Sequence, residues 1–132
     1  MNTYVRVLMV LTIFFDALFG SYFDLYTSSF VFDKVLHTFG SYAFSLFAYI
    51  LVMQMQTTLM DRPVKFILVL CLGVSLGVSY EILEFITDSI SHPVPPSQPS
   101  LLDTDVDLIG DLVGALLAAF HVISRKFVNK EF

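Results

Sequence analysis

The sequence predicts an all-α fold, a polytopic transmembrane helix bundle in which four helices cross the bilayer. Of its 132 residues, 56% are hydrophobic and 14% are charged, whereas about 25% charged residues are usual in a soluble domain. The mean hydropathy is +0.77, and a chain of this length has no soluble core large enough to bury so much apolar surface. A bilayer supplies the apolar surroundings, and helices satisfy their own backbone hydrogen bonds there.

The first apolar segment covers residues 4–23. Arg6 and the apolar run after it resemble the beginning of a signal peptide, but Asp16 interrupts the run and no small-x-small cleavage site follows cleanly. We therefore expect this segment to be retained as a transmembrane helix.

Three further apolar segments follow, at residues 33–56, 64–90 and 103–123. Each is close to the length that a helix needs to cross about 30 Å of hydrocarbon. They are too long for the strands of a membrane barrel and lack strict alternation of polar and apolar residues. Four helices in one small chain are therefore the prediction.

The connections between these segments differ in character. Residues 61–65 form a tight polar turn, whereas residues 91–102 form the longest loop and hold four of the five prolines. Proline-rich segments resist helix formation and favour extended geometry. The sequence contains no repeat, linker or second domain, so residues 1–132 are predicted to form a single transmembrane domain.

The basic residues orient the predicted bundle. With four helices, the N-terminus, the turn at residues 61–65 and the C-terminus share one side of the membrane, and only Lys34 falls on the other. An excess of Lys and Arg marks the cytoplasmic side, so both termini are predicted to be cytoplasmic. The residues on that side are Arg6, Arg62, Lys65, Arg125, Lys126 and Lys130.

Each predicted helix has one face of small and polar residues, because positions three or four apart share a face. An acidic side chain exposed to lipid costs roughly 3 kcal/mol, so these faces are expected to point inward. Small residues let membrane helices approach closely, as in Gly110-x-x-x-Gly114. The faces consist of Thr12, Asp16 and Gly20; Asp33, His37, Ser41 and Ala48; Gly73, Gly77, Glu81, Glu84 and Asp88; and Asp103, Asp107, Asp111, Gly114 and Ala118.

The acidic residues and one histidine are predicted to form a single layer near the non-cytoplasmic face. Carboxylates with an imidazole suit divalent ions such as Mg²⁺, Mn²⁺ or Zn²⁺. So many carboxylates in a membrane must be offset by a bound cation, shared protons or water. The candidate metal ligands are Asp33, His37, Glu81, Glu84, Asp103, Asp107 and Asp111.

Simpler roles compete with the metal site for some polar residues. Five aspartates can be solvated helix ends: Asp24, Asp33, Asp88, Asp103 and Asp105. Of these, Asp33 and Asp103 can be helix N-caps. His92 and His121 are expected to have structural roles only. The single cysteine, Cys71, excludes an intramolecular disulfide and a cysteine metal site, and its apolar surroundings predict a small buried side chain.

Three motifs resemble known membrane-protein families. Asp33-Lys34-Val35-Leu36-His37 is similar to the Asp-Lys-x-x-His motif of the VanZ-like proteins, and Tyr80-Glu81-Ile82-Leu83-Glu84-Phe85 resembles the Tyr-Glu-x-x-Glu motif of the YjdF-like inner-membrane proteins. Asp103-Thr104-x-x-Asp107, followed by Asp111-x-x-Gly114, resembles the last motif of both. The VanZ-like pattern usually has Gln at position 84, Asn at position 111 and an Arg before the last Asp, so the YjdF-like group is the closer match.

The resemblance covers roughly residues 30–120. It implies a multi-pass protein of the cell inner (plasma) membrane and marks the metal candidates as motif positions, but it implies no reaction.

Three hypotheses for function remain open. The first is a metal-dependent enzyme that acts on a membrane lipid or cell-envelope precursor, with Glu81 or Glu84 as general base. The second is an ion- or proton-handling carrier, for which a pore in so short a chain would require a homo-oligomer. The third is an accessory or structural subunit. Nucleic acid is not an expected partner, because the net charge is −5 and the few basic residues are scattered.

Overall fold

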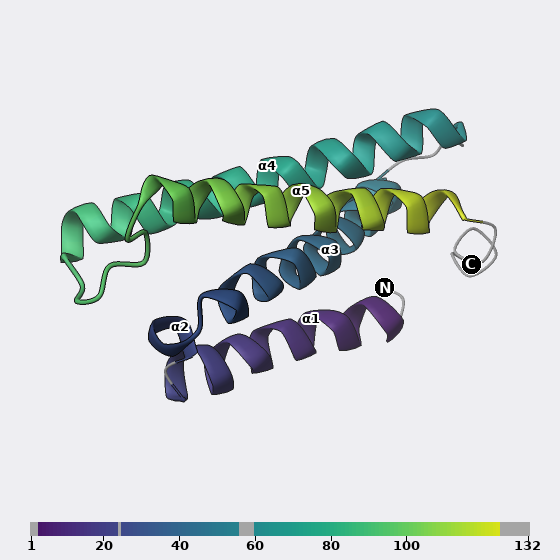
Figure 1. Cartoon of the computed structure of the whole chain (residues 1–132). Helices are drawn as coiled ribbons and strands as arrows, with labels where there is room; N and C mark the ends of the chain where they lie inside the picture. The colour runs from purple at the N-terminus through teal and green to yellow at the C-terminus, as the bar shows by residue number, and fades with distance from the viewer. Residues whose placement is uncertain (1–2, 24, 56–59, 125–132) are drawn as a thin grey trace.

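The computed structural model describes residues 3–23, 25–55 and 60–124, and every regular element in these ranges is a helix (Figure 1). The all-α prediction is confirmed. The elements are α1 (Thr3–Phe15), a π-helical continuation of α1 (Asp16–Tyr22), α2 (Leu25–Ser28), α3 (Phe30–Met55), α4 (Arg62–Ser91) and α5 (Leu101–Ile123).

Four of these helical stretches are long and apolar enough to cross a membrane by length and composition. They are Thr3–Gly20, Phe30–Met55, Arg62–Ser91 and Leu101–Ile123. Two features lie outside the sequence prediction: the first helix ends as a π-helix, and α2 adds a single extra turn. The predictions that Asp24 is a solvated helix end and that Arg125, Lys126 and Lys130 are cytoplasmic concern residues outside the described ranges.

Helices α3, α4 and α5 pack against one another, whereas α1 packs along α3, and within the described residues the α1 backbone makes no close approach to that of α4 or α5 (Figure 1). Near the start of α1, side chains still reach α5, where the Tyr4 ring packs edge-on against His121. The bundle has two unlike ends. At the end that carries the start of α1, an apolar core is fully buried and includes Leu46, Tyr49, Val69 and Val122. The opposite end, which carries α2 and the α4–α5 loop (left in Figure 1), is called the polar end below.

Gly114 sets how closely α3 and α5 approach. A Cβ at this position would overlap the backbone oxygen of Thr38 and would lie 2.9 Å from the backbone nitrogen of Tyr42. Only a glycine lets the α5 backbone lie directly on the α3 backbone in this way. The small-residue pattern in α5 therefore does what the sequence predicts, and it brings the polar faces of the two helices together.

Two predictions about single residues are wrong. Cys71 is exposed on α4, facing outward from the bundle, because the inward positions on that helix belong to Gly73 and Gly77. The N-cap alternative also fails: Asp33 lies inside α3, which begins at Phe30, and Ser100 caps α5 by accepting a hydrogen bond from the Asp103 amide.

Candidate functional site

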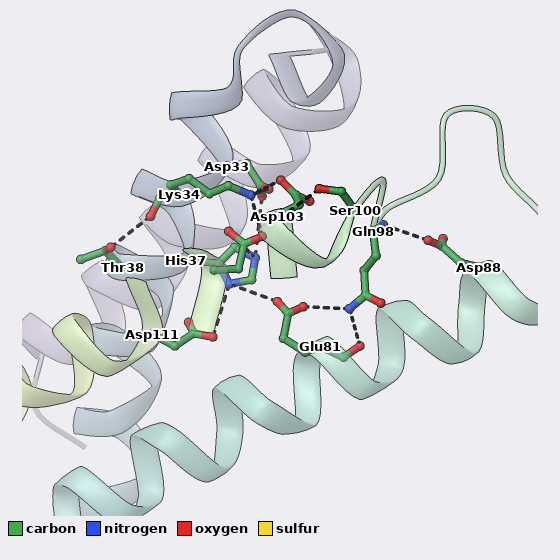
Figure 2. A network of polar contacts seen from close by, with 11 residues as sticks. Asp33, Lys34, His37, Thr38, Glu81, Asp88, Gln98, Ser100, Asp103 and Asp111 are labelled. Atoms are coloured by element: carbon green, nitrogen blue, oxygen red, sulfur yellow. Dashed lines mark hydrogen bonds and ion pairs between the residues drawn. The ribbon is translucent and has the colours of Figure 1, made fainter. Parts of the chain in front are cut away.

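The His37 imidazole lies buried at the centre of the polar end, between two pairs of carboxylates (Figure 2). Its Nε2 atom is 3.7 Å from Asp33 Oδ1 and 3.8 Å from Asp107 Oδ1. Its Nδ1 atom is 3.4 Å from Asp111 Oδ2 and 3.8 Å from Glu81 Oε1. One residue of α3 thus joins carboxylates from α3, α4 and α5.

Helix geometry explains how the three helices deliver these groups. Asp33 and His37 are one turn apart on α3, and Asp107 and Asp111 are one turn apart on α5, so each pair shares a face. On α4, Gly77 lies beside Asp111, and a Cβ there would overlap the Asp111 carboxylate. The small residue on one helix thus makes room for the acidic residue of another.

Of the four contacts around His37, the one from Nδ1 to Asp111 Oδ2 at 3.4 Å is a long hydrogen bond, and the other three are longer still. Contacts of 3.7–3.8 Å are too long for hydrogen bonds. Two ligands bound at about 2.0–2.2 Å to one tetrahedral ion lie about 3.3–3.6 Å apart. The contact of 3.4 Å from Nδ1 to Asp111 lies in this range, and the contacts of 3.7–3.8 Å are slightly longer. Two groups have potential ligand atoms that all lie within 4.8 Å of one another: Asp33, His37 and Asp107; and His37, Glu81 and Asp111.

Two buried carboxylate oxygens in these groups have no hydrogen-bond partner among the described residues. They are Glu81 Oε1 and Asp107 Oδ1, the same atoms that face the imidazole nitrogens of His37. Leaving a buried charged acceptor unpaired is costly. The arrangement therefore calls for a cation or a proton between each oxygen and the imidazole.

Lys34 already supplies a cation to one of the two groups. Its Nζ atom donates to Asp103 Oδ1 at 2.5 Å, to Asp107 Oδ2 at 2.6 Å and to Asp33 Oδ2 at 2.9 Å (Figure 2). The Nε2 side of His37 is thus partly neutralised by a lysine. Within the described residues, no lysine or arginine forms an ion pair with Glu81 or Asp111 on the Nδ1 side.

The proline-rich loop folds back onto Glu81. Gln98 Nε2 donates to Glu81 Oε2 at 2.8 Å and to the Glu81 backbone oxygen at 2.9 Å. Asp88 holds this part of the loop by accepting from the amide of Gln98 at 2.8 Å (Figure 2) and from the amide of Ser97 at 3.0 Å. Gln98 thus fixes one oxygen of Glu81 and leaves the other directed at His37.

An apolar pocket of about 340 Å³ adjoins this cluster between α1, α3 and α4. Its lining reaches His37 and Asp111. Close to them, the Tyr26 hydroxyl of α2 donates to Asp16 Oδ1 at 2.5 Å. Partial burial and this hydrogen bond hold the pKa of Tyr26 well above its usual value, so the phenol keeps its proton.

The predicted ligands are thus mostly found together. Asp33, His37, Glu81, Asp103, Asp107 and Asp111 converge at the polar end, with Asp103 bound to Lys34. Glu84, one turn beyond Glu81 on α4, belongs to neither ligand group among the described residues. Gln98 and Lys34 were missed as site residues, although the position of Lys34 within the Asp33–His37 motif was a signal for its inclusion.

The two remaining histidines lie away from the cluster. His92 ends α4 in a left-handed conformation with a φ of 47°. His121 lies near the other end of α5, hydrogen-bonded to the Tyr42 hydroxyl and stacked on its ring. These arrangements support the expected structural roles.

The fold and the cluster together define a class, that of integral membrane proteins with four apolar helices and a buried acidic and histidine cluster. The chain belongs to the family described as "Predicted membrane protein (DUF2238)", whose family model matches residues 1–126. It is similar to an uncharacterized protein of Thermotoga maritima, with 32% identity over 104 residues. That match covers 79% of this chain and 54% of the relative, so the chain spans about half of the relative's length. No solved structure matches the chain.

Proposed function

We propose that this protein binds a divalent metal ion through His37 Nδ1, Glu81 and Asp111, and that it acts on a lipid or cell-envelope substrate at the cell inner membrane. The observation that carries the proposal is the buried Glu81 Oε1, which faces His37 without a hydrogen-bond partner among the described residues. Gln98 holds the other oxygen of the same carboxylate. The unpaired oxygen is therefore held in place rather than free to rotate toward water.

The donor set fits such an ion. One imidazole and two carboxylates are ligands for Zn²⁺ or Mn²⁺, and the two negative charges match a divalent cation. Three protein ligands are the usual number in catalytic sites, where a further position is open. The bound ion would polarise an ester or phosphoester oxygen and generate a nucleophile from water. Since Glu81 is a ligand in this arrangement, Glu84 one turn away is the proposed general base.

The family membership is consistent with the resemblance to YjdF-like inner-membrane proteins. The more distant resemblance to the VanZ-like family rests on the sequence motifs alone. This resemblance supports a cell-envelope setting. We propose that the polar end faces the non-cytoplasmic side, because Arg6, Arg62 and Lys65 lie at the opposite end of the bundle.

Metal content tests the proposal directly. We expect the protein purified in detergent to contain about one equivalent of a divalent metal, and three variants to lose it: His37→Ala, Glu81→Gln and Asp111→Asn. Asp105→Asn is the matched control, because Asp105 is an exposed aspartate on the same helix. Elemental analysis of all five preparations makes the comparison. Absence of metal from every preparation after growth with added Zn²⁺ and Mn²⁺ would contradict the metal site.

The contact from Gln98 gives a second prediction. Residues that orient metal ligands typically change affinity about 10–100-fold when they are replaced, so Gln98→Ala is expected to weaken metal binding by about tenfold or more. Gln54→Ala, a change of an exposed glutamine on α3, is expected to leave affinity unchanged. Titration with a competing chelator measures both. Equal affinities for the two variants would show that Gln98 does not position Glu81.

An ion- or proton-handling carrier is the alternative function, but the arrangement of polar groups favours it less. Leu46, Tyr49 and Val69 are fully buried in the apolar core at the other end of the bundle. A relay across the membrane needs polar groups or water along its length. A liposome flux assay that detects cation or proton movement would favour the carrier.

A further inference from the structure

We propose that the apolar pocket between α1, α3 and α4 binds the acyl chain of a membrane lipid whose head group contains an amine. The pocket has a volume of about 340 Å³, within the range of small-molecule sites of about 300–1,000 Å³. The inference deepens the proposed function by naming a substrate class for the adjoining site, but chain binding itself does not need the metal ion.

The pocket opens sideways, toward the bilayer. Within the described residues the backbones of α1 and α4 make no close approach, so the pocket is open on the side between these two helices, while α3, Tyr26 of α2 and Asp111 of α5 form the rest of its lining. Side chains on its two edges are exposed, with Ile13 of α1 at 55% and Leu83 of α4 at 60%. An apolar opening at this depth of a membrane protein meets hydrocarbon rather than water.

The pocket is polar at one end and apolar at the other, in the same order as the head group and acyl chain of a membrane lipid. Its ionisable Asp and His groups gather at the polar end, where Asp16, His37 and Asp111 reach the lining, and the other polar side chains of the lining, such as those of Thr12 and Ser41, carry only hydroxyls. Toward the other end the lining is formed by Phe44 and Leu76. Phe44 lies seven residues beyond His37 on α3, which corresponds to about 10 Å along the helix axis. One leaflet of hydrocarbon is about 15 Å deep, so the pocket matches most of one acyl chain with its head group at the polar end.

The charges at the polar end select the head group. The lining contains the carboxylates of Asp16 and Asp111, of which Asp111 is already in contact with His37 Nδ1, and among the described lining residues there is no lysine or arginine. Tyr26 donates to Asp16 Oδ1, and in the part of the chain that the structure describes no hydrogen bond engages Oδ2, so Asp16 is the acceptor for the head group. Such a site favours an ammonium group, because a charge-assisted hydrogen bond to a carboxylate is among the stronger polar contacts. A head group with only anionic charge meets repulsion here.

A single tryptophan can report on the pocket, because the chain contains none. Phe44→Trp places the reporter at the apolar end of the pocket, and Phe120→Trp places a matched reporter on the exposed surface of α5. In detergent with a chelator present, we expect chain-brominated phosphatidylethanolamine to quench the Phe44→Trp reporter saturably. Chain-brominated phosphatidylglycerol is expected to bind about tenfold more weakly, as the loss of one charge-assisted hydrogen bond predicts. The Phe120→Trp reporter is expected to show only shallow, non-saturating quenching.

A variant whose pocket is filled by an added side chain is the control for lipid binding. A Cβ at Gly40 would meet only Thr12 Cγ2 at an ordinary 3.6 Å, so a leucine side chain there can enter the pocket without a backbone clash. Gly40→Leu is expected to abolish saturable quenching while the thermal unfolding temperature is maintained. Saturable quenching that survives this change, equal quenching of both reporters, or tighter binding of phosphatidylglycerol would each overturn the inference. Since the chelator removes any bound ion, failure here is distinct from failure of the metal site, which the metal content decides separately.

Discussion

Replacing Gly114 by alanine is expected to destabilise the bundle strongly and to disrupt the His37 cluster at the same time. The added Cβ would overlap the backbone oxygen of Thr38, and a backbone atom cannot rotate aside as a side chain can. Overpacking of this kind typically costs about 1–3 kcal/mol, and the higher helix propensity of alanine returns about 1 kcal/mol. Because α3 and α5 must separate to relieve the overlap, we expect a net loss of about 2 kcal/mol.

A matched change at Gly40 separates the effect of packing from that of helix propensity. Gly40 lies on the same side of the bundle as the pocket, and its added Cβ would have only an ordinary contact with Thr12. Gly40→Ala is therefore expected to keep or slightly raise stability, while Gly114→Ala lowers it. Thermal unfolding in one detergent compares the two variants. Equal unfolding temperatures would contradict the close contact between α3 and α5.

The sequence predicts the fold well because each of its signals is local. Four apolar segments of membrane-crossing length are recognisable one at a time, and the structure has a long apolar helix at each. The spacing of Asp33 and His37, and that of Asp107 and Asp111, shows which residues share a helix face. The cost of exposing charge to lipid then requires these faces to point inward, and this requirement is why the amino-acid sequence alone predicts the cluster.

The partner of each group could not be predicted, because those contacts join distant parts of the chain. The Lys34 ion pairs to Asp103 and Asp107 span 69 and 73 residues, and helix periodicity carries no information about which helices are neighbours. Gln98 lies in a loop without periodicity, so its contact with Glu81 had no local signal. Glu84 follows the spacing of the polar face but lies outside both ligand groups, since a spacing of three or four residues defines a broad face rather than one direction.

Replacing Lys34 by methionine is expected to have the largest effect of any single change in the cluster. Methionine keeps a long, flexible apolar side chain beside Phe30, over which the ammonium lies at 4.9 Å from the ring centroid. It removes the cation shared by Asp33, Asp103 and Asp107, whose side chains are 19%, 10% and 3% exposed. Removing one partner of a buried ion pair costs about 3–5 kcal/mol. We expect about 3 kcal/mol here, because Asp33 retains some solvent.

A second change tests whether electrostatic repulsion is the cause. In the Lys34→Met background, Asp103→Asn removes one of the three negative charges and is expected to restore part of the lost stability, although the same change alone removes an ion pair and destabilises the protein. Such opposite signs in a double-mutant cycle indicate direct coupling. Thermal unfolding of the four proteins completes the cycle. Additive effects would show that Lys34 contributes through packing rather than through its charge.

The Lys34→Met variant also tests whether the Nε2 side of His37 can bind a divalent ion as the Nδ1 side is proposed to do. If Lys34 takes the place of a cation at the Nε2 side, removing it leaves the Asp33, His37 and Asp107 group free to bind a divalent ion. Added Mn²⁺ is then expected to raise the unfolding temperature of Lys34→Met more than that of the unchanged protein, because a ligand that binds only the folded state stabilises it. The metal content of this variant should also rise above that of the unchanged protein. Equal responses to Mn²⁺ in both proteins would show that the lysine does not occupy the position of a divalent ion, and shared protons or water would then offset the charge that Lys34 leaves unpaired when it is removed.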